Sequence, residues 1–205
     1  MFTLRTTLIV TAALATVVTL AACSSSESGG SMNGMNHSAT PTGGSATGTF
    51  NTADVMFVNG MIPHHTQAVA MADTLLKKTG IDPTVTALAV QIKGEQTPEI
   101  TEMTSWLTTW NVPSNAASSM PGMNMGTGTG MMSDSDMSEL DSATGLTASK
   151  LFLTQMIQHH EGAIGMAKNE SRIGKSPEAM KLAKAIISSQ SAEITTMRNL
   201  ITTIK

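Results

Sequence analysis

An internal repeat constrains the fold of this chain more than any other feature. The segment MIPHHTQAVAMA, Met61 to Ala72, returns 95 residues later as MIQHHEGAIGMA, Met156 to Ala167. After a slip of one residue the similarity continues in further pairs: Leu88 and Leu182, Ile92 and Ile186, Gln96 and Gln190, Glu99 and Glu193, Met103 and Met197. A repeat of this size predicts two copies of one supersecondary unit, neither of which buries its apolar face alone.

Each copy has the pattern of a pair of helices. We expect helices over residues 53–79, 83–111, 147–173 and 177–204, with Asp82 and Ser176 as N-caps ahead of a proline in the first helical position. Alternating β-branched runs are absent, so strands are not expected. The sequence therefore predicts an all-α fold, a four-helix bundle of two helix-hairpin repeats related by a pseudo-twofold axis.

Low-complexity tracts flank the repeats. The expected organisation is a signal peptide at 1–22, a flexible tether rich in Ser, Gly and Met at 23–51, the first repeat at 52–112, a Met/Gly-rich disordered crossover at 113–145 and the second repeat at 146–205.

The amino terminus predicts export. Arg5 precedes an apolar run from Leu8 to Ala22, which is too short for a permanent membrane span and ends before Cys23. This is the pattern of a bacterial lipoprotein signal, whose cysteine is acylated; an ordinary signal with a chance cysteine is the alternative. We expect lipid on Cys23 to anchor the protein to the outer face of the cell membrane, or on the periplasmic side or outer membrane of a Gram-negative source.

Charge and cysteine content narrow the partners further. Cys23 is the single cysteine, so no disulfide forms within the chain. The formal net charge is −3, from 12 basic and 15 acidic residues, and no basic run follows residue 5. Nucleic acid is therefore not an expected partner.

Helical spacing places the repeated histidines on the buried face. At 100° per residue, Met61, His64 and His65 share one stripe with Met71 at its edge. The second copy repeats this with Met156, His159, His160 and Met166. The partner helices place polar residues in their apolar seams: Gln96 and Glu99 before Met103, and Gln190 and Glu193 before Met197.

A purely structural role is the alternative for these residues. A single inward histidine is more often a hydrogen-bonded core residue than a ligand, and a methionine at helical spacing is usually core filler. Four imidazoles in one small bundle are harder to explain by packing, whereas neutral imidazole is a common metal ligand and bundle cores assemble metal sites. We therefore predict a metal centre formed by the histidine and methionine residues of both copies, with the glutamines and glutamates as auxiliary or orienting groups.

Methionines outside the expected helices point to a soft metal. Thioethers suit Cu(I), and an exposed tract can wrap that ion without preformed geometry. Sacrificial oxidant trapping or compositional drift are the alternatives. Eight such methionines occur: Met32, Met35, Met120, Met123, Met125, Met131, Met132 and Met137. Those of MNGMNH, together with His37, and those of MPGMNM are the auxiliary soft-metal candidates.

The donor types favour copper among the metals, with Cu(I) preferred. Imidazole and thioether with few carboxylates do not suit magnesium, calcium or manganese, and zinc has little use for methionine. A di-iron oxidase would carry Glu-x-x-His on two helices, and no glutamate here has histidine at that spacing. No organic cofactor is expected.

From Asn51 to Lys205 the chain, with its two H-H motifs in F-x-x-x-M-I-P-H-H-x-x-A-x-x-M-A and F-L-T-Q-M-I-Q-H-H-E-G-A-I-G-M-A, resembles the bacterial family called domain of unknown function 305. The resemblance implies a ferritin-like four-helix bundle. Some exported members are implicated in copper binding and tolerance, which implies copper ligation by Met61, His64, His65 and Met71 and by their counterparts Met156, His159, His160 and Met166. Gln158 departs from the family's usual proline.

The resulting expectation is an exported lipoprotein that binds copper for sequestration, tolerance or transfer, and that is not an enzyme. A copper donor or acceptor protein is an expected partner, and a homodimer is possible. Two alternatives stay open: an interaction module whose histidines and glutamates form a buried polar network, and a copper-dependent redox enzyme.

Overall fold

The structure, a computed structural model, describes residues 49–114 and 129–205. The predicted leader, the predicted lipidation site Cys23 and the predicted tether as far as residue 48 lie outside the described residues. So do the auxiliary soft-metal candidates: Met32, Met35, His37, Met120, Met123 and Met125.

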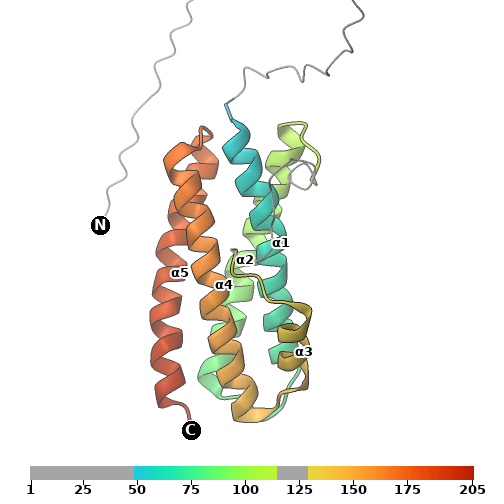
Figure 1. Cartoon of the computed structure of the whole chain (residues 1–205), viewed down its shortest axis with the longest axis vertical. Coiled ribbons are helices and arrows are strands. Elements are labelled where there is room, and N and C mark those ends of the chain that lie inside the picture. Colours follow the sequence, from blue (N-terminus) through green and yellow to red (C-terminus); the bar gives the residue numbers. More distant parts are fainter. Residues whose placement is uncertain (1–48, 115–128) are drawn as a thin grey trace, which may run out of the picture. The chain divides into compact units, whose positions relative to one another are not determined.

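The all-α prediction is confirmed. The described residues form five helices and no strands, and Figure 1 shows the long ones side by side as a bundle. Their bounds are α1 Thr52–Leu76, α2 Pro83–Thr109, α3 Asp134–Ser142, α4 Gly145–Ile173 and α5 Pro177–Thr203.

Local sequence explains where the long helices begin. Asn51 caps α1 in a capping box, because its side chain accepts from the backbone of Asp54 while Asp54 accepts from the backbone N–H of Asn51. Asp82 and Ser176 cap α2 and α5, each followed by proline as expected. Pro63 lies within α1 and does not end it.

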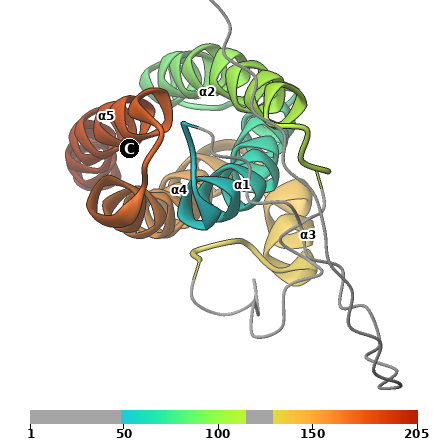
Figure 2. The same cartoon turned by 90° about the horizontal axis from the view of Figure 1, so that it is seen from above.

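The two repeats pack as antiparallel hairpins joined by α1 and α4. Helix α1 contacts α2, α4 contacts α5, and the main contact between repeats is α1 with α4. The side-chain amide of Asn51 donates to the carbonyl oxygen of Ile173 at 2.8 Å, which places the start of α1 beside the end of α4. In Figure 2 the four long helices surround a common interior, and α3 lies outside them beside α1.

The prediction that the whole crossover is disordered is wrong for its second half. Helix α3 forms there because Ser133 and Asp136 make a capping box and the side chain of Leu140 is fully buried. Met132 is only 6% exposed, and Met137 packs on the same core. Core packing therefore accounts for Met132 and Met137, which the sequence had placed among the methionines that point to a soft metal. The polar composition of the tract hid these few apolar contacts.

Among the described residues, no helix combines the length and the apolar character that a membrane span requires.

Candidate metal centre

The four repeated histidines lie in the interior at the middle of the bundle. His65, His159 and His160 are fully buried and His64 is 1% exposed. The rings of His64 on α1 and His159 on α4 contact each other across the repeat interface, with centroids 3.7 Å apart and planes tilted by 37°. Histidines from both repeats therefore meet in one place, between the two helices that join the repeats.

The second histidine of each doublet is paired with a glutamate of its own hairpin. Nε2 of His65 lies 2.7 Å from Oε2 of Glu99 on α2, and Nε2 of His160 lies 2.7 Å from Oε2 of Glu193 on α5. The Glu99 side chain is 20% exposed and the Glu193 side chain 5%. These pairs repeat the pseudo-twofold symmetry, and they match the usual arrangement in which a carboxylate orients a metal-binding imidazole.

The first histidines break the symmetry. Nε2 of His64 lies 2.8 Å from the carbonyl oxygen of Thr129, in the crossover. A carbonyl only accepts, so this nitrogen carries a proton and donates it. In the described part of the chain, neither ring nitrogen of His159 has a hydrogen-bond partner. A hydrogen bond thus holds the His64 ring, whereas no hydrogen bond holds the equivalent His159 ring within the described residues.

Burial keeps the central pair neutral. It lowers the pKa of the His64 imidazole to about 3, and the neighbouring His65 and His160 act in the same direction, against the stabilising Thr129 carbonyl. Burial also lowers the pKa of His159 well below its ordinary value, with His64 as the next cause. The backbone of His64 acts on the pKa of His159 in the opposite direction. Neutral imidazole is the form that binds metals.

Each of the four imidazoles has an unpartnered, buried Nδ1 within the described residues. A buried polar nitrogen without a partner costs about 1–3 kcal/mol. Where Nε2–H donates to a carboxylate or carbonyl oxygen, the lone pair lies on Nδ1. The arrangement therefore presents nitrogen donor atoms in an interior without water contacts, at an energetic cost that a bound cation would offset.

The six predicted thioether residues divide into two symmetry-related sets. Both sets combine side chains of the two repeats. Met61 and Met103 belong to the core cluster nearer the start of α1, and Met166 packs against that cluster. Met71, Met156 and Met197 belong to the cluster nearer the end of α1. All are fully buried except the half-buried Met166. We name these the upper and lower methionine sets. Because the histidines lie between them along α1 and α4, each set borders the histidine layer.

Nitrogen and carboxylate donors alone do not complete a metal centre here. Among the described residues, no three side chains of His, Cys, Asp or Glu form a group that could hold a metal ion. A site at the His64–His159 pair would therefore include sulfur. The donors present fit a soft cation of low coordination number and do not fit a hard divalent ion.

The auxiliary glutamines are in the interior as well. Gln96 is 3% exposed and Gln190 2%, and the amide oxygen of each lacks a hydrogen-bond partner in the described residues. Their equivalent positions on α2 and α5, one turn before Glu99 and Glu193, keep them as candidates for orienting groups.

Sequence reasoning missed the interactions of three polar side chains. Asp54 on α1 is fully buried and accepts from the backbone N–H groups of Lys175 and Ser176, so it joins the start of α1 to the start of α5. Glu170 on α4 is 1% exposed, and burial, reinforced by Asp54, raises its pKa to about 8. Gln67 holds the crossover through Met132. A single sequence gives no indication that residues 65 to 122 positions apart are in contact.

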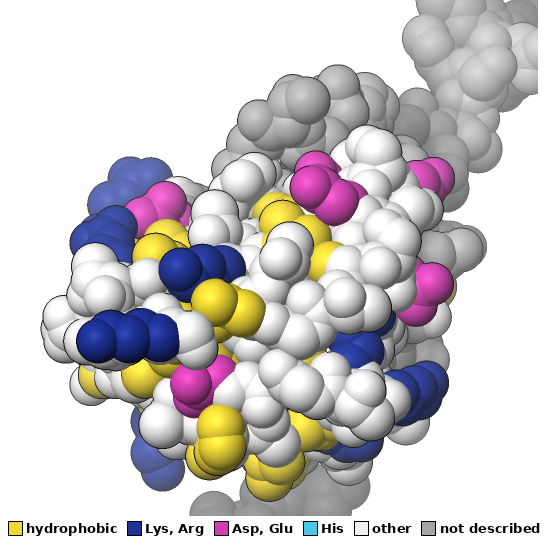
Figure 3. Space-filling model, turned by 90° about the horizontal axis from the view of Figure 1, so that it is seen from below, with side chains coloured by type: hydrophobic (Ala, Val, Ile, Leu, Met, Phe, Trp, Pro, Cys, Tyr) yellow, Lys and Arg dark blue, Asp and Glu magenta, His cyan; other side chains and the backbone are white. Residues whose placement is uncertain are grey.

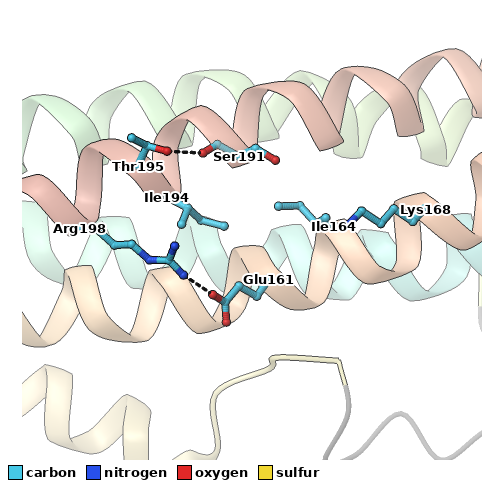
Figure 4. Close-up of a pocket in the computed structure, with 7 residues that line it drawn as sticks. All are labelled: Glu161, Ile164, Lys168, Ser191, Ile194, Thr195 and Arg198. Carbon is cyan, nitrogen blue, oxygen red and sulfur yellow. Dashed lines mark hydrogen bonds and ion pairs between the residues drawn. The ribbon is translucent and has the colours of Figure 1, made fainter.

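The described part of the surface has a groove, and none of the described histidines is exposed. The groove, about 360 Å³ in volume, lies between α4 and α5 and is crossed by the exposed pair Arg198 and Glu161 at 2.8 Å, with Lys168 at its edge (Figure 4). On the bundle end drawn in Figure 3, apolar, basic and acidic side chains are mixed and no histidine is visible. The metal-centre candidates are therefore interior groups.

Several solved structures are similar to this chain. The chain is similar to a crystal structure of a DUF305 protein from Streptomyces coelicolor, at 32% identity and a TM-score of 0.66 over 72% of this chain and 89% of that one. It is also similar to a DUF305 fragment from Deinococcus radiodurans, at 30% identity and 0.65 over 74% and 96%. CopM in its Cu(I)-bound form matches at 34% identity and 0.58 over 71% and 93%.

A curated viral protein, uncharacterized protein L153 of Acanthamoeba polyphaga mimivirus, is 43% identical over 54 residues. That match covers 26% of this chain and 35% of the viral protein, so the chain spans about a third of that relative. The profile of the family described as domain of unknown function, DUF305, matches residues 54–201. With the duplicated His-His motif inside the matched region, this chain belongs to the DUF305 family.

Proposed function

We propose that this protein binds copper, preferentially as Cu(I), in the interior of its bundle and holds it for sequestration or transfer. The observation that carries the proposal is the His64–His159 contact between the upper and lower methionine sets. Imidazole nitrogens without hydrogen bonds lie in a buried layer, and along α1 and α4 buried methionines of both repeats flank that layer on either side.

The chemistry of the donors supports Cu(I) over Cu(II). Neutral imidazole and thioether are soft donors, and Cu(I) accepts few ligands without a strict geometry. The carboxylates that Cu(II) would favour are engaged with His65 and His160. In this proposal they orient those imidazoles rather than bind the metal first.

The relatives support metal binding in general. Structures of CopM are described in Cu(I)-bound, Cu(II)-bound and silver-bound forms, and each is at least 32% identical to this chain. Silver(I) is a soft cation of the same charge as Cu(I), so its binding to CopM agrees with the same class of donor.

The cellular setting is part of the proposal. The leader and Cys23 support export and a lipid anchor at the membrane surface, and the Streptomyces relative is provisionally described as secreted. We propose a binding protein rather than an enzyme, with a copper donor or acceptor as its partner. The tail methionines and His37 would add capture capacity outside the bundle.

The test is a titration of the purified full chain with Ag(I) and with Cu(I) under competition from a chelator. Mass spectrometry would give the stoichiometry, and thermal melts would give the stabilisation. Wild-type protein is expected to retain metal and melt higher when loaded. The double variant His64→Leu/His159→Leu is expected to lose the bundle-bound metal. Met61→Leu and Met156→Leu, equivalent residues of opposite methionine sets, are each expected to weaken it.

Met56→Leu is the matched control, since Met56 lies on α1 outside both methionine sets and is half-buried. It should bind metal as the wild type does. If the wild type retains no metal and melts alike with and without it, the buried polar network is purely structural. If the loaded protein catalytically oxidises a substrate, the redox-enzyme alternative replaces storage or transfer.

A further inference from the structure

A short piece of the crossover lies against the histidine layer. We call residues Thr129–Met132 the crossover strap. Its first residue places a carbonyl oxygen 2.8 Å from Nε2 of His64. Its last residue is only 6% exposed and belongs to the core cluster that contains the lower methionine set. The strap therefore runs from the metal-centre candidate into the core.

Gln67 on α1 holds the strap with both ends of its amide. Its Nε2 donates to the carbonyl oxygen of Met132 at 2.9 Å, and its Oε1 accepts from the N–H of Met132 at 2.8 Å. Two hydrogen bonds to one residue fix both position and orientation. Gln67 lies three residues after His64, so the same face of α1 holds the strap and carries the imidazole that the strap touches.

Gly162 on α4 makes room for the strap. A Cβ at this position would overlap the carbonyl group of Thr129, and backbone atoms cannot give way as a flexible side chain can. Gly130 approaches α4 in turn, with φ of +74°, and a Cβ there would overlap the carbonyl oxygen of Gln158. Only glycine allows this close approach on both sides.

Gln67 and Gly162 are equivalent positions of the two repeats, 95 residues apart like His64 and His159. The histidines are the same in both repeats, but these two residues differ. Gln67 binds the strap by hydrogen bonds, and Gly162 leaves the space that the strap occupies. A single crossover has no symmetry-related copy, so it cannot contact both repeats in the same way. The two repeats therefore have different residues where the strap lies. The strap carbonyl accepts from Nε2 of His64, whereas neither ring nitrogen of His159 has a hydrogen bond within the described residues.

We infer that the crossover strap positions His64 as a metal ligand: its Thr129 carbonyl fixes the Nε2–H tautomer and ring orientation and leaves Nδ1 as the donor atom. Gln67 and Gly162 act through the strap and are positioning residues. This inference rests on the proposed copper-binding function and adds to it that the equivalent histidines are unequal ligands.

Two observations support this role. The strap carbonyl does for His64 what Glu99 and Glu193 do for His65 and His160: it accepts a hydrogen bond at Nε2. The His64 ring is only 1% exposed, so water has little access to compete with the Thr129 carbonyl for this N–H. Such orienting partners typically change metal affinity by about 10–100-fold when removed.

The test uses variants of the full chain, because a backbone carbonyl cannot be removed by substitution. Gly162→Ala displaces the strap by steric overlap, and Gln67→Ala releases it without adding atoms. Nitrogen NMR of 15N-histidine-labelled apo protein reads the tautomer of His64 directly. Wild type is expected to show a protonated Nε2 and an unprotonated Nδ1, and both variants are expected to show a mixture of tautomers. Ag(I) affinity should fall about tenfold or more in both.

Gly165→Ala is the matched control, since it makes the same change on α4 where a Cβ meets nothing within 4 Å. It should keep the wild-type tautomer, Ag(I) affinity and melting temperature. Circular dichroism would confirm that all three variants remain helical, and Gln67→Ala provides the test should Gly162→Ala fail to fold.

The outcomes distinguish the positioning role of the strap from the copper-binding function. If the wild type binds Ag(I) and both strap variants keep its tautomer and its affinity, the positioning role is overturned and the copper-binding function stands. If the wild type binds no Ag(I), the proposed function fails and the metal role of the strap fails with it. A lost tautomer with weakened Ag(I) binding in both variants supports the inference.

Discussion

The imidazole rings of His64 and His159, equivalent residues of the two repeats, contact each other with centroids 3.7 Å apart at the interface of α1 and α4. A bundle core would be more stable with apolar side chains there, because neutral imidazoles lose hydrogen bonds to water on burial. The same imidazoles that would bind a metal should therefore lower the stability of the metal-free bundle.

His159→Leu should stabilise the apo protein by about 1 kcal/mol, because it replaces two nitrogens that lack hydrogen bonds with an apolar group of similar size. Denaturant unfolding of metal-free protein measures this. The neighbouring His160→Leu should instead destabilise by about 3–5 kcal/mol, since it removes the imidazole from Oε2 of the buried Glu193 carboxylate and leaves only the 3.3 Å hydrogen bond from Gln91 at Oε1. A large loss of stability in His159→Leu would contradict the geometry described for that ring.

The two glutamates should differ in importance. Glu193→Ala is expected to lower Ag(I) affinity by about 10–100-fold, because it removes the acceptor that orients His160. Glu99→Ala should have a smaller effect, since the Glu99 side chain is 20% exposed and water can take its place beside His65. Competition titrations of the two variants provide the comparison. Equal losses would show that exposure at this position is unimportant.

The stability of the bundle should depend on pH through Glu170. Its pKa is raised from 4.5 to about 8 in the folded protein, so the folded state holds a proton that the unfolded state releases. This contribution favours the folded state at low pH and diminishes as pH rises from about 4.5 to 8. Glu170→Gln, which cannot ionise, should flatten this part of the pH profile of unfolding.

Glu102→Gln is the control for that experiment, since Glu102 is an exposed carboxylate on α2. It should keep the wild-type slope. Free energies of unfolding at several pH values from 5 to 9 would decide the matter, and a Glu170→Gln profile parallel to the wild type would refute the shifted pKa.

Helix α3 should contribute to stability although it lies outside the four long helices. Leu140→Ala is expected to cost about 2–5 kcal/mol, because the Leu140 side chain is fully buried. Leu146→Ala, at a residue that is 36% exposed at the start of α4, should change stability by no more than about 0.5 kcal/mol. Equal stabilities of the two variants would contradict the packing of α3 and would support the disorder that the composition of the crossover predicts.

Local sequence patterns predicted the long helices well. Proline after Asp82 and Ser176 marked the starts of α2 and α5, and those helices begin at Pro83 and Pro177. The beginnings of α1 and α4 were each predicted within two residues. Helix α3 escaped prediction because its capping box is short and its single buried residue, Leu140, carries no periodicity.

The amino-acid sequence by itself determined the duplicated helical hairpin and the burial of both histidine doublets, because spacing along a helix decides which face a side chain shares. Tertiary structure alone decided which of those groups meet. The Thr129 carbonyl reaches His64 from 65 residues away, and Asp54 reaches Ser176 from 122. Such contacts depend on how the repeats pack and where the crossover returns, and no local pattern encodes that. The twofold symmetry of the sequence is thus broken in space by the single strap that joins its halves.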